Sequence, residues 1–290
     1  MHGTVLALDV GGTKLAAGRV DAEGRLVARV ASPTPADGDA ETVFETLLQA
    51  AIEVRSGDEV AVGVGSGGPM SPDGETVSPL SIRGWRGFPL RARLQEALGL
   101  DVTVDNDAKA LALGEGWVGA ARGERDFIAM VVSTGVGGGI VLEGRLLDGA
   151  GGNAGHIGHV IVEPEGRRCP CGARGCLEAE VSGTAIAART GRPASEADAV
   201  ERARAGRLVG RAVASAAALL DLRLAVVAGS VALGFGAPFF QAAQAELDRS
   251  ARIEFVRGIR IRPAGLGDEG PLVGAGAVAW RARGLSVSGG

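Results

Sequence analysis

Four residues that bind transition metals lie within one short segment of the chain. All three cysteines, Cys169, Cys171 and Cys176, follow His159 closely. Together they supply the nitrogen and sulfur ligands of a closed tetrahedral zinc site, with no position left for water. Reduced structural thiols are the alternative, because buried free cysteine is common. A catalytic thiol is disfavoured because nothing in the sequence exposes one cysteine beside a base, and an odd number of cysteines argues against a disulfide framework.

Two glycine-rich turns suggest phosphate binding. Residues 7–20 (ALDVGGTKLAAGRV) and 130–144 (MVVSTGVGGGIVLEG) both read as an apolar strand, a polar residue, a glycine turn with a threonine, and a second apolar strand. One such turn alone is more simply a hairpin, but backbone N–H groups in a pair of them, with the hydroxyls of Thr13 and Thr134, form anion sites. The absence of a Gly-Lys dipeptide excludes a P-loop, and a strand-turn-strand unit does not fit the dinucleotide fingerprint. The likeness of the two segments also raises the hypothesis of an internal duplication.

Carboxylates and an amide stand at the ends of predicted strands. Asp9 ends a buried strand just before the first turn, where it faces bound phosphate and helps to hold Mg²⁺ through water; capping the turn is the alternative role. Asn106 and Asp107 lie between a strand and a helix, where either residue is also a candidate N-cap. The functional interpretation makes Asp107 the acceptor of a proton from a substrate hydroxyl, with Asn106 orienting the same molecule.

The elements that position these residues alternate in an α/β order. The chain begins with a three-stranded meander, and the pattern begins again near Asp126, which predicts two α/β lobes with a cleft between them. We expect an N-terminal lobe over residues 1–107, joined by the closing helix 271–284, and a C-terminal lobe over 108–270 that carries the zinc loop 159–176. Further helices are expected in the C-terminal lobe at 177–190, 195–205 and 208–222.

Composition narrows the classes of partner. The chain has 290 residues, 46% of them hydrophobic, a net charge of −4 and a pI near 5.6, so it can bury a large core and has no field that gathers nucleic acid or anionic lipid. No apolar run is long enough for a membrane helix, and no signal peptide is recognisable. We therefore expect a cytoplasmic protein whose partners are small molecules or another subunit, without nucleic acid or membrane.

Five segments in order resemble the motifs of the ROK family of sugar kinases and repressors: LALDVGGTKLAAG, VDNDAKALALGE, VVSTGVGGGIV, AGHIGHV and CPCGARGCLEAEVSGTAI. The resemblance extends over nearly the whole chain. It implies the two-lobed actin-like ATPase (ribonuclease H-like) fold, ATP and Mg²⁺ in the cleft, a structural Zn²⁺, and phosphorylation of the 6-hydroxyl of a hexose.

The resemblance also assigns roles to individual residues. Asp107 would be the general base. The metal ligands would be the three cysteines and His159. Sugar contacts would come from Gly68, Asn106, Asp107, His156, His159 and Glu178. ATP would be bound by Asp9, Gly11, Gly12, Thr13, Lys14, Thr134, Gly135, Gly229 and Ser230. The segment that holds the last two usually carries two glycines, and here Ala228 replaces the first.

One residue that departs from the common family motif, His156, suggests which sugar is phosphorylated. Most glucose-phosphorylating members carry Glu at the position of His156, whereas the motif AGHIGH is similar to bacterial N-acetylmannosamine kinases. A carboxylate accepts hydrogen bonds from the 1- and 2-hydroxyls, while an imidazole also donates one, as a 2-acetamido carbonyl requires. This favours N-acetylmannosamine, with glucose as the alternative, because the segment SPLSIRGWRGFPL also suits general hexose kinases of the family.

Two other classes of protein compete with a kinase. Repressors of the family place a helix-turn-helix before the first phosphate motif, and the position of Asp9 leaves no room for one. A non-catalytic sugar-binding protein is disfavoured by the intact Asp107 and both phosphate turns. By analogy with the family alone, we expect a homodimer or homotetramer.

Overall fold

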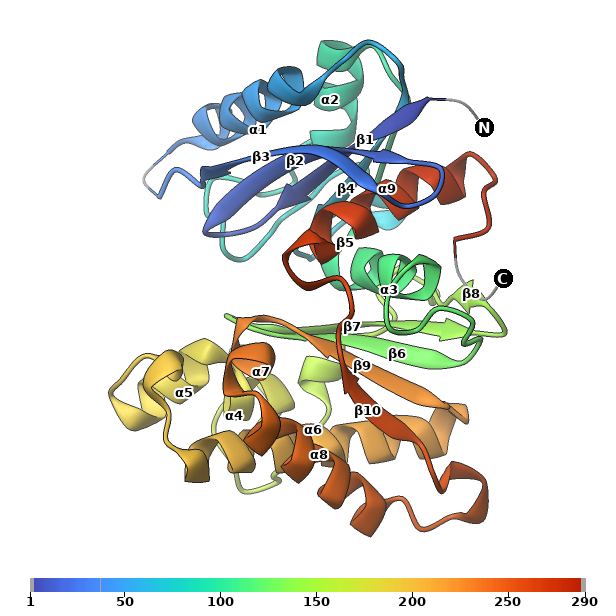
Figure 1. The fold of residues 1–290 in the computed structure, drawn as a ribbon. Helices are drawn as coiled ribbons and strands as arrows, with labels where there is room; N and C mark the ends of the chain where they lie inside the picture. The colour runs from blue at the N-terminus through green and yellow to red at the C-terminus, as the bar shows by residue number, and fades with distance from the viewer. Residues whose placement is uncertain (1–2, 37, 288–290) are drawn as a thin grey trace. The chain divides into compact units, whose positions relative to one another are not determined.

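The computed structural model describes residues 3–36 and 38–287 and divides into two compact units. Unit 1 runs to Gly123 and also contains Asp148–Ala154 and the chain from Leu266 onward. Unit 2 consists of Glu124–Leu147 and Gly155–Gly265. Each unit is an α/β structure built on its own five-stranded sheet (Figure 1). The predicted fold class, with the architecture of the actin-like ATPases, is confirmed.

The sheet of unit 1 joins an antiparallel meander to two parallel strands, in the order β3-β2-β1-β4-β5. The meander forms because turns of glycine and acidic residues separate three apolar runs, as the sequence predicts. The strands are β1 (Thr4–Val10), β2 (Lys14–Asp21), β3 (Leu26–Pro33), β4 (Glu59–Ser66) and β5 (Val102–Asn106). β1 lies antiparallel to β2 and parallel to β4, so the first glycine turn and the carboxyl end of β5 belong to the same sheet.

Helices cover both faces of this sheet (Figure 1). They are α1 (Ala40–Val54), α2 (Leu90–Leu98), α3 (Asp107–Trp117) and α9 (Gly270–Ala282). The Asp39 side chain starts α1 by accepting a hydrogen bond of 2.8 Å from the Thr42 N–H. Gly63 of β4 lets α9 approach, since a methyl group at Gly63 would lie 1.9 Å from the Ala275 carbonyl oxygen.

Unit 2 repeats the same sheet order. Its strands are β6 (Phe127–Val132), β7 (Val136–Leu142), β8 (Arg145–Leu146), β9 (Leu224–Ala228) and β10 (Arg260–Pro263), arranged β10-β9-β6-β7-β8. As in unit 1, three antiparallel strands are followed by two parallel ones. The shared topology supports the duplication that the two glycine turns suggest.

The helices of unit 2 differ from the sequence prediction in two places. They are α4 (Leu177–Val181), α5 (Gly183–Thr190), α6 (Ala199–Leu220), α7 (Ser230–Phe235) and α8 (Ala237–Ser250). The helix expected at 177–190 is broken at Ser182, whose extended backbone lets its hydroxyl cap α5 at Ala185 N. The two helices expected at 195–205 and 208–222 are the single helix α6, because Gly206 continues the helix.

Packing explains why glycine is kept inside α6. A methyl group at Gly206 would lie 2.2 Å from the Phe239 carbonyl oxygen, and one at Gly210 would lie 2.4 Å from the Ala243 carbonyl oxygen. Both carbonyls belong to α8, so the two glycines permit a close crossing of α6 and α8 that offsets their low helix propensity.

The division between units differs from the expected one at residue 107. Helix α3 packs against α9 and β4, so the chain as far as Gly123 belongs to unit 1 together with α9. Asp148–Ala154 also belongs to unit 1. The buried Lys109 ammonium binds Asp148 Oδ1 at 2.7 Å and Asp105 Oδ1 at 2.9 Å, which attaches this short segment to α3.

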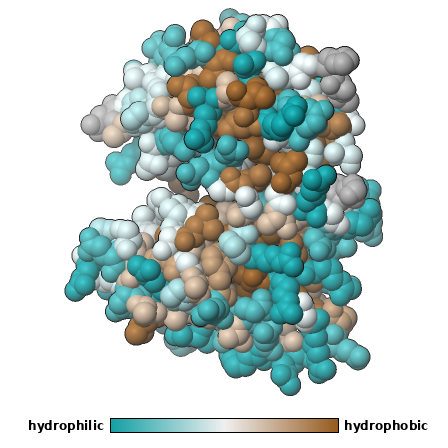
Figure 2. All heavy atoms as spheres, in the orientation of Figure 1, coloured by the Kyte–Doolittle hydropathy of each residue, from teal (hydrophilic) through white to brown (hydrophobic). Residues whose placement is uncertain are grey.

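The surface mixes residue types. On the face drawn in Figure 2, hydrophilic residues are interspersed with hydrophobic ones in each unit. Within residues 3–36 and 38–287, none of the helices combines the length and the apolar composition needed to cross a membrane.

Candidate functional site

The first glycine turn lies between β1 and β2 in unit 1. The Gly11 N–H donates to the Lys14 carbonyl at 3.0 Å and closes the turn. Thr34, just after β3, donates from its hydroxyl to the Gly11 carbonyl at 2.7 Å and from its N–H to the Thr13 carbonyl at 3.1 Å. These two carbonyl oxygens are engaged with Thr34. The opposite side of the turn is therefore suited to donate backbone N–H groups to an anion such as phosphate.

Asp9 is the next-to-last residue of β1, close to this turn, and is partly buried. Burial and, to a smaller extent, the charge of Asp107 raise the pKa of its carboxyl, and Lys14 opposes them, so that the pKa moves from 3.8 to about 7. Two carboxylates therefore act on one another at the mouth of the phosphate turn. A cation held there would relieve their repulsion, which fits Mg²⁺ and its preference for oxygen ligands.

Asn106 and Asp107 stand where β5 becomes α3. The Asn106 side chain accepts a hydrogen bond of 3.0 Å from Ala108 N and so caps the helix, while the Asp107 side chain is exposed. Two glycines in the loop after β4 lie close to both residues. A methyl group would lie 3.7 Å from Asn106 Nδ2 if placed at Gly68, and 4.0 Å from Asp107 Oδ2 if placed at Gly67. Gly68, Asn106 and Asp107 are thus brought together in unit 1.

The second glycine turn, between β6 and β7, is held in a similar way. The Gly183 N–H donates to the Ser133 carbonyl at 2.7 Å, and the Thr184 hydroxyl donates to the Thr134 carbonyl at 2.8 Å. Both donors come from the start of α5. The carbonyls of this turn are therefore engaged from behind, as they are in unit 1.

Glu178 in α4 connects this turn to the zinc loop. Its Oε2 accepts a hydrogen bond of 2.9 Å from Val136 N, and it would lie 3.0 Å from a methyl group at Gly135. The first residue of α4, Leu177, donates from its N–H to the Val160 carbonyl at 2.9 Å. Helix α4 thus joins the second turn to the segment that carries His159.

Gly229 and Ser230 lie beside the second turn at the end of β9. Gly229 has a φ of 97°, and a methyl group there would lie 2.3 Å from the Val132 carbonyl oxygen. Only glycine fits this position without strain. The Ser230 hydroxyl is 2.9 Å from the Ser133 hydroxyl, so the predicted adenosine segment and the predicted phosphate turn are neighbours within unit 2.

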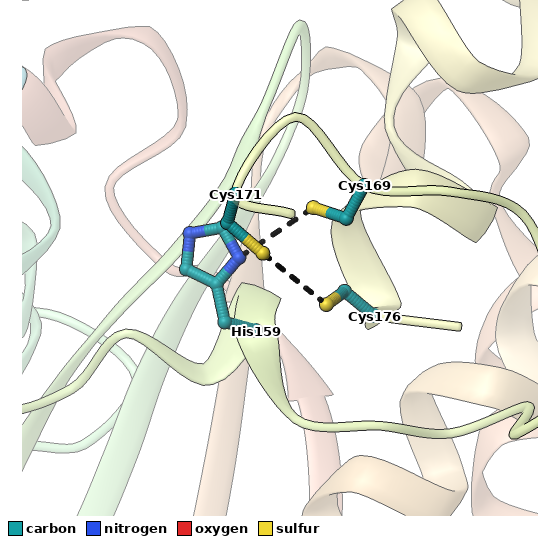
Figure 3. Close-up of side chains that lie close together, drawn as sticks. All are labelled: His159, Cys169, Cys171 and Cys176. Atoms are coloured by element: carbon teal, nitrogen blue, oxygen red, sulfur yellow. Dashed lines mark hydrogen bonds between the residues drawn. The ribbon is translucent and has the colours of Figure 1, made fainter. Parts of the chain in front are cut away.

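The histidine and cysteine ligands predicted from the sequence converge on one point (Figure 3). One ligand atom from each of His159, Cys169, Cys171 and Cys176 lies within 4.8 Å of all the others. Cys169 Sγ is 3.7 Å from His159 Nδ1, and Cys171 Sγ is 3.7 Å from Cys176 Sγ. A tetrahedral zinc ion with Zn–S bonds of about 2.3 Å spaces its sulfur ligands roughly 3.8 Å apart, so the donors and their spacing fit Zn²⁺.

The loop that carries these ligands is fixed by its own hydrogen bonds. Cys169 N donates to the Ala173 carbonyl at 2.8 Å, which turns the chain back on itself between the ligands. The buried Glu180 accepts from Arg167 N at 2.6 Å and pairs with Arg204 of α6. Burial raises the pKa of the Cys176 thiol to about 12, so binding of a metal to its thiolate releases a proton that the protein otherwise holds.

His156 lies next to the ligand histidine. The ring centroids of His156 and His159 are 6.2 Å apart, and the planes differ by 18°. Since His159 Nδ1 faces the cysteines, its Nε2 is the nitrogen left for another partner. The two imidazoles are therefore neighbours within this segment of unit 2.

Three residues that support the site were not predicted from the sequence. Thr34, Thr184 and the buried Lys109 support the predicted site residues through hydrogen bonds or ion pairs. Threonine before a turn or at a helix start has no distinctive local pattern. The sequence offers a signal only for Lys109. A lysine inside the apolar run of α3 predicts an acidic partner, because a buried cation has to be paired.

A cavity of about 360 Å³ lies between the end of α8 and β10, lined by Asp248, Arg252 and Arg257 among others. The predicted site residues do not line it. Its lining residues lie in a stretch of unit 2 that is separate in sequence from the second glycine turn and the cysteine loop.

Comparison with known proteins places these motifs in a family. The family model described as "ROK family" matches residues 5–282. The glucokinase of Thermotoga maritima is 40% identical over 185 residues, which are 63% of this chain and 58% of that protein. The chain therefore matches less than two thirds of that relative's length.

Two further comparisons cover more of the chain. The N-acetylmannosamine kinase of Citrobacter koseri is 37% identical over 249 residues, 80% of this chain and 85% of that protein. The crystal structure of a ROK family glucokinase from Streptomyces griseus, in complex with glucose and AMPPNP, has a TM-score of 0.82 and 31% identity. It covers 96% of this chain and 100% of that one.

Proposed function

Because the chain belongs to the ROK family, we propose that it is an ATP-dependent kinase that phosphorylates the 6-hydroxyl of a hexose or N-acyl hexosamine. One observation carries the proposal. Asp9 lies near the end of β1, just before a glycine turn suited to phosphate, and both burial and the charge of Asp107 at the start of α3 raise its pKa. A phosphate turn with a carboxylate of this kind beside it is what transfer from a phosphate donor to a hydroxyl acceptor requires.

The proposed reaction transfers the γ-phosphoryl group of ATP to the 6-hydroxyl of the sugar. The sugar 6-oxygen forms a bond to the γ-phosphorus, the bond from that phosphorus to the β,γ-bridging oxygen breaks, and ADP leaves with the electron pair. Asp107 accepts the hydroxyl proton and returns it to solvent. The protein contributes mainly by holding donor and acceptor in line and by stabilising charge.

For the nucleotide, we assign the two turns to phosphate and Gly229 with Ser230 to adenosine. In unit 1 these are Asp9, Gly11, Gly12, Thr13 and Lys14, and in unit 2 they are Thr134 and Gly135. Mg²⁺ bound near Asp9 would neutralise charge on the triphosphate. The Lys14 ammonium supplies a further cation beside the turn.

For the sugar, we assign Gly68, Asn106 and Asp107 in unit 1 and His156, His159 and Glu178 in unit 2. His159 would have two roles, with Nδ1 on the metal and Nε2 on a hydroxyl. The zinc ion is a structural element in this scheme, because four protein ligands leave it no open position for water. Its effect on catalysis is to fix the His159 ring.

N-Acetylmannosamine is the sugar we favour, with glucose as the alternative. The support is His156, which can donate a hydrogen bond to an acetamido carbonyl where a glutamate only accepts. Relatives named for each of the two sugars have similar identity to this chain, so neither sugar is preferred on that ground. A cytoplasmic location and a homodimer or homotetramer remain predictions.

The reaction is tested with purified protein, Mg²⁺-ATP and a panel of hexoses and hexosamines, reading ADP release. We expect one or more acceptors to raise ADP release far above the sugar-independent rate. Sugar binding with no ADP release from any acceptor would instead favour a non-catalytic binding protein or a regulator.

The acceptor is tested at His156. Wild type should have a higher kcat/KM for N-acetylmannosamine than for glucose, and His156→Glu should shift the ratio toward glucose by about 1 to 3 kcal/mol, the scale of one mismatched buried hydrogen bond. His156→Gln, which keeps a donor and an acceptor, is the matched control and should shift it less. A tenfold preference of the wild type for glucose would reverse the choice of sugar and leave the kinase proposal intact.

A further inference from the structure

Ser81 packs directly against the first phosphate turn. A methyl group at Gly12 would lie 2.3 Å from Ser81 Cβ and 2.6 Å from Ser81 Oγ. The φ of Gly12 lies outside the left-handed region, so its backbone does not itself require glycine. Residue 12 has no room for a side chain because Ser81, which is far away in the sequence, occupies the space that a side chain would need.

The loop that carries Ser81 is anchored in the core of unit 1. Ile82 and Trp85 are buried, and Trp85 Nε1 donates to the Ala40 carbonyl at 3.0 Å. The Trp85 ring stacks on Phe88, with centroids 4.4 Å apart and planes within 1°. The buried residues Ile82 and Trp85 therefore anchor the loop 79–85 close to its exposed residues.

Arg86 holds the carbonyls of this loop together. Its Nη1 lies 3.0 Å from the Pro79 carbonyl oxygen, 3.0 Å from that of Ile82 and 2.7 Å from that of Trp85. A guanidinium keeps its charge at any working pH, and charge-assisted hydrogen bonds are stronger than neutral ones. One side chain thus ties both ends of the loop 79–85 to its middle.

The other end of the loop approaches the proposed base. Pro79 Cβ would lie 3.7 Å from a methyl group at Gly67, and the same methyl group would lie 4.0 Å from Asp107 Oδ2. The loop therefore packs against the glycine turn through Ser81, and through Pro79 it approaches Gly67, which is itself close to Asp107. Both contacts are within unit 1.

We propose that Arg86 is a positioning residue for phosphoryl transfer, and that the loop 79–85 which it holds is a spacer between the Gly12 turn and Asp107. This rests on the proposed kinase function and adds a residue to it. The physical need is clear, because a misplacement of about 1 Å between reacting groups costs roughly 10²-fold in rate. Neither Arg86 nor Ser81 has to touch a substrate for the spacer to act.

The first test compares two arginines of the same segment. Arg86→Met removes the hydrogen bonds but keeps much of the side-chain volume, Arg86→Lys keeps the charge, and Arg83→Met removes an exposed arginine nearby. We expect Arg86→Met to lower kcat about tenfold or more with a smaller change in the KM for ATP, Arg86→Lys to recover part of the loss, and Arg83→Met to resemble wild type. Equal kcat for Arg86→Met and Arg83→Met would overturn the proposal.

The second test uses suppression. Gly12→Ala should lower kcat/KM by roughly 10²-fold because its methyl group collides with Ser81. Ser81→Gly removes the colliding atoms, so Gly12→Ala/Ser81→Gly should recover at least about tenfold over Gly12→Ala. If phosphate itself excludes the methyl group, the double variant stays as slow as Gly12→Ala, and the packing role of Ser81 is wrong.

Amide hydrogen exchange on ligand-free protein separates this proposal from the kinase assignment. Arg86→Met should exchange faster than Arg83→Met over residues 10–15 and 78–86. Faster exchange in a protein that transfers no phosphate to any sugar would contradict the kinase assignment but keep the structural link. Unchanged exchange in an active kinase would contradict the spacer alone.

Discussion

The two units share a sheet order but differ in what they place at the glycine turn. In unit 1 the strand before the turn carries Asp9 as its next-to-last residue, and a second carboxylate, Asp107, acts on it electrostatically. In unit 2 the matching positions carry Ser133 and Thr134, and the acidic neighbour, Glu178, comes from a helix. One topology thus supports two chemistries: unit 1 has the groups suited to a metal and a base, and unit 2 has hydroxyl donors and the metal loop.

The two turns are nevertheless braced by the same device. In each unit a threonine from a later segment donates to the carbonyls of the turn: Thr34 to Gly11, and Thr184 to Thr134. In each unit a side chain also packs where a turn glycine lacks one, Ser81 at Gly12 and Glu178 at Gly135. In both units, therefore, a threonine hydroxyl engages a carbonyl oxygen of the glycine turn, although the residues around the two turns differ in chemistry.

The largest expected effect concerns the base of unit 1. Asp107→Asn should lower kcat by roughly 10² to 10⁴, the range for loss of a general base, while the fold and sugar binding persist. Steady-state kinetics with the best acceptor, together with a thermal melt, checks this. Near-normal turnover of the variant would remove Asp107 from the mechanism.

The metal loop of unit 2 should respond in stability as well as activity. Purified protein should contain about one zinc ion per chain, and Cys171→Ser should lose it and lower the free energy of unfolding by more than about 2 kcal/mol, roughly 5 °C or more in Tm. Metal analysis and calorimetry measure both quantities.

A matched substitution outside the ligand set, Arg168→Ala, should keep both the metal and the Tm. Metal-free protein with unchanged Tm and activity would show that the cluster is not a zinc site.

The two braces can be compared directly. Thr34→Val and Thr184→Val each remove one hydroxyl donor to a turn carbonyl, and each should lower kcat/KM for ATP by about tenfold, the equivalent of roughly 1.4 kcal/mol. Thr34→Ser and Thr184→Ser keep the hydroxyl and serve as controls. A loss confined to one unit would mean that only that turn binds phosphate.

The last prediction concerns stability alone and is the pH dependence that Asp9 gives to it. Its pKa is raised from 3.8 to about 7 in the fold, so the folded state binds this proton more tightly than the unfolded chain and loses stability as pH rises through that interval. Asp9→Asn abolishes the titration. The Tm of the variant should therefore exceed that of wild type by more at pH 8 than at pH 4, measured without Mg²⁺. A difference that is the same at both pH values would contradict the raised pKa.

Much of the fold follows from local pattern. Strands such as β1 and β9 are apolar runs bounded by glycine or polar residues, and the cysteine cluster is local in sequence, so both could be predicted. The fusion of the two expected helices into the single helix α6 could not be predicted. It depends on the close packing of Gly206 against the Phe239 carbonyl of α8.

The supports of the site were harder to predict than its chemistry. Asp107 and the glycine turns stand at recognisable strand ends. Ser81 reaches Gly12 across a long stretch of chain, and Arg86 acts through three carbonyls, a contact that no residue pattern encodes. Contacts between distant segments form only once the core has fixed the loops.

The most direct test of the kinase assignment is the identity of the product. Incubation of wild type with Mg²⁺-ATP and N-acetylmannosamine or glucose, followed by phosphorus NMR, should show a phosphate ester at carbon 6. The 6-deoxy sugar should give no ester, and Asp107→Asn should form the ester far more slowly. Absence of any sugar phosphate, or an ester at another carbon, would contradict the account.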